Sequence, residues 1–210
     1  MYQKLIAQMR NTYHDITAKD GEKIKDCVQL LLKDIHMDNR ERYPLPVVQL
    51  LRQVGFDLFR TEFQNPQQSG LIAVDSALGE QNTLFASGRI ILVNRNDSTA
   101  HQRFTIAHEL AHYIFDYDEQ NQLIYYKPYL TSETDDDVEL RANRFAAELL
   151  MPTDDFKRYF YDLKSEQGDA FSLPNTVTEL SRIFDAPPTA VQKRLYETGI
   201  LPQQEAVENA

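Results

Sequence analysis

The chain has 210 residues and a formal net charge of -10 at pH 7, from 22 Lys and Arg against 32 Asp and Glu. This excess of acid argues against a generic binder of nucleic acid, because such proteins need a basic surface for the phosphates. The glycines are too widely spaced for a dinucleotide-binding fingerprint or a Walker loop. No apolar run reaches the roughly 20 residues of a membrane span, and the N-terminus lacks the apolar core of a signal peptide.

The single cysteine, Cys27, excludes an intrachain disulfide and any zinc site built from several cysteines. It falls on the apolar face of an expected helix, where a buried structural thiol is favoured over a nucleophile. Cysteine usage and the absence of a leader therefore predict a cytoplasmic protein with no membrane partner.

Apolar residues recur at helical spacing in three N-terminal segments. The expected helices are 2–16, 24–35 and 47–54. Gly21 separates the first two, while Pro46 opens the third and Gly55 follows its end. Short apolar and aromatic runs then predict strands. These are 56–63, 71–74, 83–86 and 89–93, with Ser87–Gly88 as a hairpin turn between the last two.

Helices are expected to dominate the C-terminal half, and Asp97 or Ser98 is placed to cap the first of them. The expected helices are 99–115, one that starts within 131–137 and runs to about 150, 154–164, 177–184 and 189–198. The order of elements predicts an α+β chain in four parts: an N-terminal helical segment, a core with a short sheet, a C-terminal helical subdomain and a flexible tail. Their expected bounds are 1–43, 44–152, 153–201 and 202–210.

The central expected helix contains His-Glu-Leu-Ala-His at 108–112. Residues four apart on an α-helix differ by about 40° in direction, so His108 and His112 leave the same face. This spacing lets two imidazole nitrogens bind one zinc ion, and Glu109 lies close enough to hold a water without itself ligating. A helix with two structural histidines is the alternative, although chance gives this pattern in only about one such chain in two hundred.

A catalytic zinc takes a third protein ligand and keeps one position open. No histidine follows His112 in the sequence. His101 lies about 10 Å along the helix axis from His108, which is too far to share a metal. His14 and His36 belong to the N-terminal helices. The third ligand is therefore expected to be a carboxylate.

Glu139, at the start of the next long helix, is the favoured carboxylate. Asn143 follows four residues later on the same face and can accept a hydrogen bond from His108. Glu148 competes as a ligand, but it lies about 180° round the helix from Glu139 and cannot share a face with Asn143. The alternatives are a solvated acid at Glu139 and an ordinary polar residue at Asn143.

Two segments resemble the central motifs of the ImmA/IrrE metallopeptidase family. They are RFTIAHELAHY at 103–113 and ELRANRFAAELLMP at 139–152. The segments 69–72 and 91–94 also look like the sheet of that family, and the tail at 180–195 is similar but weaker, so the resemblance covers the chain from about Pro44 to Leu201. Ala111 stands where glycine is frequent in this motif, which is a mild steric difference.

The resemblance implies a small gluzincin-like fold in which His108, His112 and Glu139 bind Zn²⁺ and Glu109 is the catalytic acid and base. It also implies an endopeptidase whose protein substrate is a DNA-binding repressor, typically of helix-turn-helix type, so that cleavage switches genes on. Glu109 would take a proton from the attacking water and pass it to the leaving amine. A further donor to the oxyanion is expected. The tyrosines at 113, 117, 125, 126 and 129 are candidates.

Two other interpretations stay open. The helix pair over 177–198 has helix-turn-helix-like spacing, with Gln192, Lys193 and Arg194 on its second helix. A regulator that binds DNA there is possible in principle, although a structural helical hairpin is favoured and direct nucleic-acid binding is not expected. Alternatively, the protein could contain zinc and bind a transcription factor without cutting it, as one half of a toxin–antitoxin pair.

Part of the negative charge is concentrated over 133–139, where five acidic residues occur with no basic residue between them. They lie at an expected helix N-terminus, where acidic side chains are stabilising. We hypothesise that the acids left after Glu139 binds metal attract the basic surface of a DNA-binding substrate.

Overall fold

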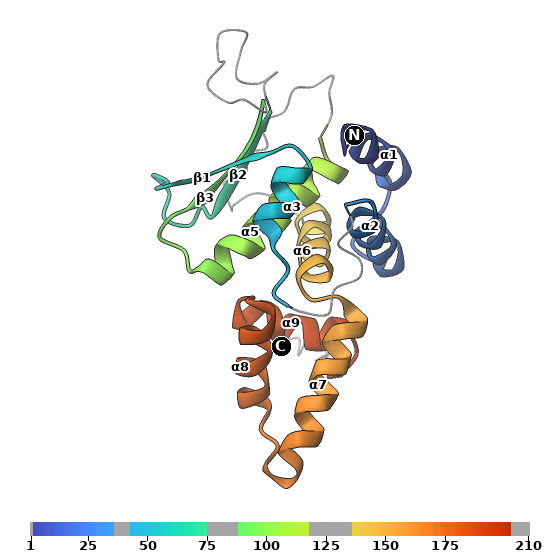
Figure 1. Ribbon diagram of the computed structural model, residues 1–210, viewed down its shortest axis with the longest axis vertical. Helices are drawn as coiled ribbons and strands as arrows, with labels where there is room; N and C mark the ends of the chain where they lie inside the picture. Colours follow the sequence, from blue (N-terminus) through green and yellow to red (C-terminus); the bar gives the residue numbers. More distant parts are fainter. Residues whose placement is uncertain (1, 36–42, 75–87, 118–135, 203–210) are drawn as a thin grey trace, which may run out of the picture.

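Helix α5 (Thr99–Phe115) lies between a small sheet and helix α6 (Asp136–Leu150), as Figure 1 shows. This computed structural model describes residues 2–35, 43–74, 88–117 and 136–202. Ser98 caps α5, because its hydroxyl accepts a hydrogen bond from the backbone N–H of His101 at 3.2 Å. Of the two caps that the sequence suggests, Ser98 is therefore the one used.

The sheet has three described strands in the order β1-β3-β2. They are β1 (Asp57–Thr61), β2 (Gly70–Val74) and β3 (Arg89–Asn94). The central strand β3 pairs parallel with β1 and antiparallel with β2, so Ile91 lies opposite both Leu58 and Ile72. The helices and this sheet confirm the predicted α+β class. The strand predicted at 83–86 lies outside the described residues.

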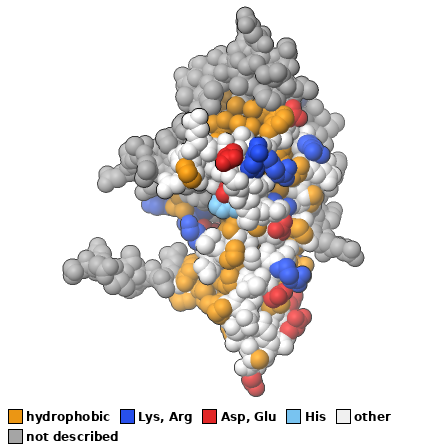
Figure 2. All heavy atoms as spheres, turned by 90° about the vertical axis from the view of Figure 1, so that its left-hand side faces the viewer, with side chains coloured by type: hydrophobic (Ala, Val, Ile, Leu, Met, Phe, Trp, Pro, Cys, Tyr) orange, Lys and Arg blue, Asp and Glu red, His pale blue; other side chains and the backbone are white. Residues whose placement is uncertain are grey.

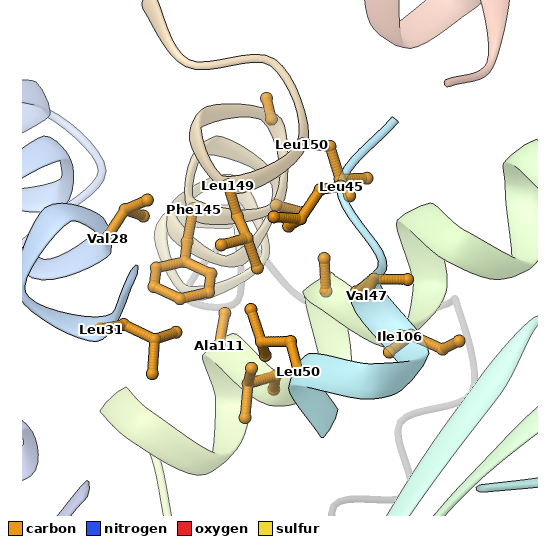
Figure 3. Packing of buried hydrophobic residues seen from close by; sticks show 14 of the residues in the cluster. Val28, Leu31, Leu45, Val47, Leu50, Ile106, Ala111, Phe145, Leu149 and Leu150 are labelled. Carbon is orange, nitrogen blue, oxygen red and sulfur yellow. The ribbon is translucent and has the colours of Figure 1, made fainter. Parts of the chain in front are cut away.

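The N-terminal helices pack on the same core as the centre of the molecule. They are α1 (Tyr2–Tyr13), α2 (Gly21–Asp34) and α3 (Val47–Gln53). Figure 3 shows Val28 and Leu31 of α2 beside Phe145 of α6, with Leu50 of α3 near Ala111 of α5. All five side chains are buried, so residues distant in sequence share one hydrophobic cluster.

Two local predictions in this part are confirmed. Gly55 has φ +91°, a conformation that L side chains rarely adopt, and it follows the last turn of α3. Cys27 is fully buried on α2, and burial raises the pKa of its thiol. A buried thiol with a raised pKa fits a structural role.

The C-terminal helices form the lower part of the molecule in Figure 1. They are α7 (Thr153–Gln167), the 3₁₀ turn η1 (Gly168–Ala170), α8 (Leu173–Phe184) and α9 (Pro188–Glu197). Arg103 of α5 donates to the backbone oxygens of Leu45 at 2.8 Å and Asp185 at 3.0 Å, which ties α5 to the end of α8. None of the described helices is long and apolar enough to cross a bilayer.

Candidate metal centre

Helix α5 projects His108 and His112 from one face, as their spacing predicts, with their Nε2 atoms 2.9 Å apart. The Nδ1 atom of His108 lies 3.1 Å from Oδ1 of Asn143, and that of His112 lies 2.8 Å from Oδ2 of Asp116. Oxygen acceptors at both Nδ1 atoms assign the ring protons to Nδ1. Two lone pairs on Nε2 then face each other, which is an arrangement that a cation between them stabilises.

Glu139, at the start of α6, completes this group. Its Oε2 lies 3.2 Å from Nε2 of His108, and its Oε1 lies 3.6 Å from Nε2 of His112. One ligand atom from each residue falls within 4.8 Å of the others. Two nitrogens and one carboxylate oxygen are a donor set that zinc accepts with a position left open. The Glu139 side chain is 37% exposed, so solvent reaches the centre from that side.

Burial and neighbouring charges shift the pKa values of His108 and Glu109. Burial disfavours the charged imidazole of His108, but the hydrogen bond that this charged ring donates to Glu139, together with the charges of Glu109 and Glu139, outweighs burial and raises the pKa of His108. Burial raises the pKa of Glu109, against the opposing effect of the two histidines. A cation at the centre would stabilise the ionised form of Glu109, which burial disfavours.

Glu109 is buried next to the strand β2. At Gly70, the first residue of that strand, an added Cβ would lie 2.8 Å from Oε1 of Glu109 and 2.3 Å from Cγ2 of Thr105. A real Cβ does not approach side chains this closely, so the strand reaches Glu109 only because residue 70 is glycine. The main chain of β2 thus packs directly against the carboxylate.

Sequence reasoning missed Asp116 and Gly70. The signal for Asp116 was present, because it follows His112 at the same four-residue spacing that relates the two histidines. Gly70 gave no such signal, since its contact with Glu109 depends on how β2 packs against α5. Asn143, by contrast, lies where the sequence predicts it, beside the ring of His108.

The competing residues lie elsewhere. Glu148 is buried and paired with Arg194 of α9, and it accepts hydrogen bonds from the backbone N–H and the hydroxyl of Thr153 at 3.1 and 2.7 Å. His101 lies 3.1 Å from the hydroxyl of Ser69, and His14 is exposed on the surface. His36 lies outside the described residues.

Most of the chain matches a known family of metallopeptidases. The profile of Peptidase_M78, the IrrE N-terminal-like domain, matches residues 52–196, a span that includes both histidines, Glu109 and Glu139. The chain belongs to this metallopeptidase family. The resemblance drawn from the sequence motifs is therefore confirmed. No individually curated protein matches the chain.

Tyr113 of α5 and Arg194 of α9 are both buried in this metallopeptidase. Tyr113 is a candidate oxyanion donor, but it is buried, and its ring centroid lies 4.9 Å from that of Phe56 and 5.0 Å from that of Tyr117. These contacts fit a role in packing. The tyrosines at 125, 126 and 129 lie outside the described residues. On α9, Arg194 is buried against Glu148, so the suggested basic surface of this helix retains only Gln192 and Lys193.

Proposed function

We propose that the protein is a zinc-dependent endopeptidase that cleaves a DNA-binding repressor at a specific site and thereby switches genes on. One observation supports the chemistry above all others. Two imidazole Nε2 atoms and the carboxylate of Glu139 converge on one point, and the buried carboxylate of Glu109 lies beside them. This is the donor set and the acid–base group that hydrolysis of a peptide bond by a metallopeptidase requires.

In this proposal His108, His112 and Glu139 hold the zinc ion, which supplies Lewis acidity that lowers the pKa of a water to about 7 and stabilises negative charge on the peptide carbonyl oxygen. Glu109 accepts the proton of the attacking water and returns it to the leaving amine. Its burial keeps bulk water away and strengthens its interaction with the reacting atoms.

Other residues of the chain hold the ligands in place. Asn143 accepts a hydrogen bond from the Nδ1–H of His108, and Asp116 does so for His112, so both Nε2 atoms stay directed at the centre. Gly70 lets the backbone of β2 approach Glu109, which fixes the carboxylate from the side of the sheet.

The proposed substrate is a helix-turn-helix repressor, and the proposed compartment is the cytoplasm. The formal charge of -10 suits a basic, DNA-binding partner, and the single buried cysteine suits a reducing environment. On the face shown in Figure 2, histidine and acidic side chains reach the surface between hydrophobic ones above and below them. A protein partner bound there could contact both charge and apolar surface.

The test combines metal analysis with a cleavage assay on a candidate repressor, such as one encoded beside this protein. We expect purified wild type and Glu109→Gln to bind one zinc ion each, and mass spectrometry to find new peptide termini with wild type alone. A stable complex with an intact repressor would instead support the non-cleaving alternative. Equal cleavage by Glu109→Gln would disprove the mechanism.

A further inference from the structure

A buried ion pair between Asp116 and Arg141 contacts His112 on the side of its ring away from the metal centre. Asp116, at the end of α5, uses one carboxylate oxygen for the Nδ1 of His112 at 2.8 Å and the other for the guanidinium of Arg141 on α6. The side chains of Asp116 and Arg141 are only 6% and 9% exposed. Both oxygens are therefore held by specific donors away from solvent, and the carboxylate has little freedom to turn away from His112.

The same guanidinium reaches the N-terminal helices. Arg141 donates to the backbone oxygen of Ile16 at 2.6 Å, in the turn that joins α1 to α2, where the Ile16 side chain is itself buried. One residue thus connects that turn, through Asp116, to the ring of His112. The turn lies outside residues 52–196, the span that matches the family.

A neighbouring contact provides a comparison. Arg144, three residues further along α6, donates to the backbone oxygen of Ala18 in the same turn, and Asp137 accepts from the N–H of Ala18 at 3.2 Å. Arg141 and Arg144 therefore both tie α6 to the turn. The difference is that Arg141 also pairs with Asp116.

We propose that Asp116 and Arg141 are positioning residues for His112, and that the turn between α1 and α2 completes this support through the carbonyl of Ile16. This inference rests on the proposed function, because it requires a metal at His112. A carboxylate that accepts from the Nδ1–H of a histidine orients the ring and makes Nε2 a better ligand. Arg141 holds that carboxylate in the correct orientation, and the Ile16 carbonyl fixes Arg141 in turn.

The first test measures zinc affinity of the full chain by competition with a chromogenic chelator. Loss of such a partner weakens metal binding by about 10–100-fold, so we expect Asp116→Asn to fall in this range and Arg141→Met near its lower end. Arg144→Met is the matched control, with an expected change of less than about 2-fold because it leaves Asp116 and His112 in place. Equal zinc affinity in wild type, Asp116→Asn and Arg141→Met would overturn the inference.

Two measurements separate positioning from general loss of structure. Thermal unfolding with excess chelator should show both Arg141→Met and Arg144→Met destabilised, Arg141→Met more so because it also leaves Asp116 without its partner, whereas zinc affinity should fall in Arg141→Met alone. Arg141→Lys, which keeps the charge, should recover part of the zinc affinity that Arg141→Met loses. If affinity simply follows the melting temperature across the three variants, Arg141 is a structural residue. Failure of wild type itself to bind zinc would instead reject the proposed function.

The part played by the turn is tested by hydrogen–deuterium exchange over residues 14–20. Coupling between two sites is reciprocal, so zinc binding should slow exchange of the amides in this turn. We expect the slowing in wild type and Arg144→Met, and its loss in Arg141→Met. Exchange that zinc leaves unchanged in wild type would show that the turn does not support the metal centre.

Discussion

Helix α6 holds two glutamates in opposite surroundings. Glu139, at its start, is 37% exposed and lies within 3.6 Å of both imidazole Nε2 atoms. Glu148, near its end, is 7% exposed and is enclosed by Arg194 and Thr153. A carboxylate enclosed with a guanidinium and a hydroxyl is fully used in holding helices together. One that faces solvent and two nitrogen lone pairs is available to a cation.

The largest expected effect concerns the metal-centre side of this comparison. Glu109→Gln removes the general base but keeps the shape of the side chain, and loss of such a group typically slows a reaction by about 10²–10⁴-fold. Zinc content should be unchanged, because Glu109 is not among the proposed ligands. The measurement is the initial cleavage rate at equal zinc occupancy. A loss of zinc in this variant would contradict the division between ligands and base.

Glu148→Gln should affect the fold rather than the metal. Breaking this buried ion pair leaves Arg194 with only its longer contact to Glu197 at 3.4 Å, and such a loss costs about 3–5 kcal/mol of unfolding free energy. Urea unfolding of the metal-free protein measures this cost, while zinc affinity should stay near that of wild type. Weaker zinc binding with unchanged stability would reverse the assignment of the two glutamates.

Glu139→Gln should behave in the opposite way. It removes a proposed ligand, so zinc affinity should fall by more than the roughly 10–100-fold expected for a residue that only supports a ligand. The half-exposed side chain contributes little to folding, and we expect less than about 1 kcal/mol of change in metal-free stability. Full zinc occupancy in purified Glu139→Gln would reject this third ligand.

Gly70→Ala sharpens the comparison by acting on Glu109 without touching a ligand. The new Cβ displaces the carboxylate or Thr105, and misplacement by about 1 Å can cost about 100-fold in rate. Cleavage should fall by roughly this factor with zinc retained. Gly21→Ala is a suitable control, because nothing lies within 4 Å of its added Cβ. Similar activity in both variants would show that β2 does not constrain Glu109.

The smallest expected effect comes from charge at long range. If acidic residues attract a basic substrate, raising the salt concentration should lower kcat/KM several-fold while leaving kcat nearly unchanged. Cleavage of a short neutral peptide should depend less on salt and provides the control. Cleavage of the repressor that is independent of salt would contradict electrostatic attraction.

Much of the metal centre could be predicted because its geometry is local. His108, Glu109 and His112 occupy one helix, so helical periodicity alone places them. The same argument ties Asn143 to Glu139 on α6. The pairing of α5 with α6 brings these two groups together, and the need for a third metal ligand points to that pairing before the family motifs add their support.

Other features depend on tertiary contacts that no local pattern encodes. The parallel pairing of β1 with β3 joins strands far apart in sequence. The close approach of Gly70 to Glu109 depends on that sheet, and the contact of Arg141 with Ile16 depends on the packing of α2 against α6. Each involves backbone atoms, whose partners the side-chain sequence does not specify.

The part of the chain that matches the family is shorter than the part that shares one hydrophobic core. The match covers residues 52–196, whereas the core already includes residues of α1 and α2. Val28 and Leu31 of α2 cover Phe145 on α6 (Figure 3), yet they precede residue 52, where the family match begins. A polypeptide cut to 52–196 would expose this apolar surface to water and would tend to aggregate. The segment before residue 52 therefore belongs to the folding unit of this chain, although it lies outside the family match.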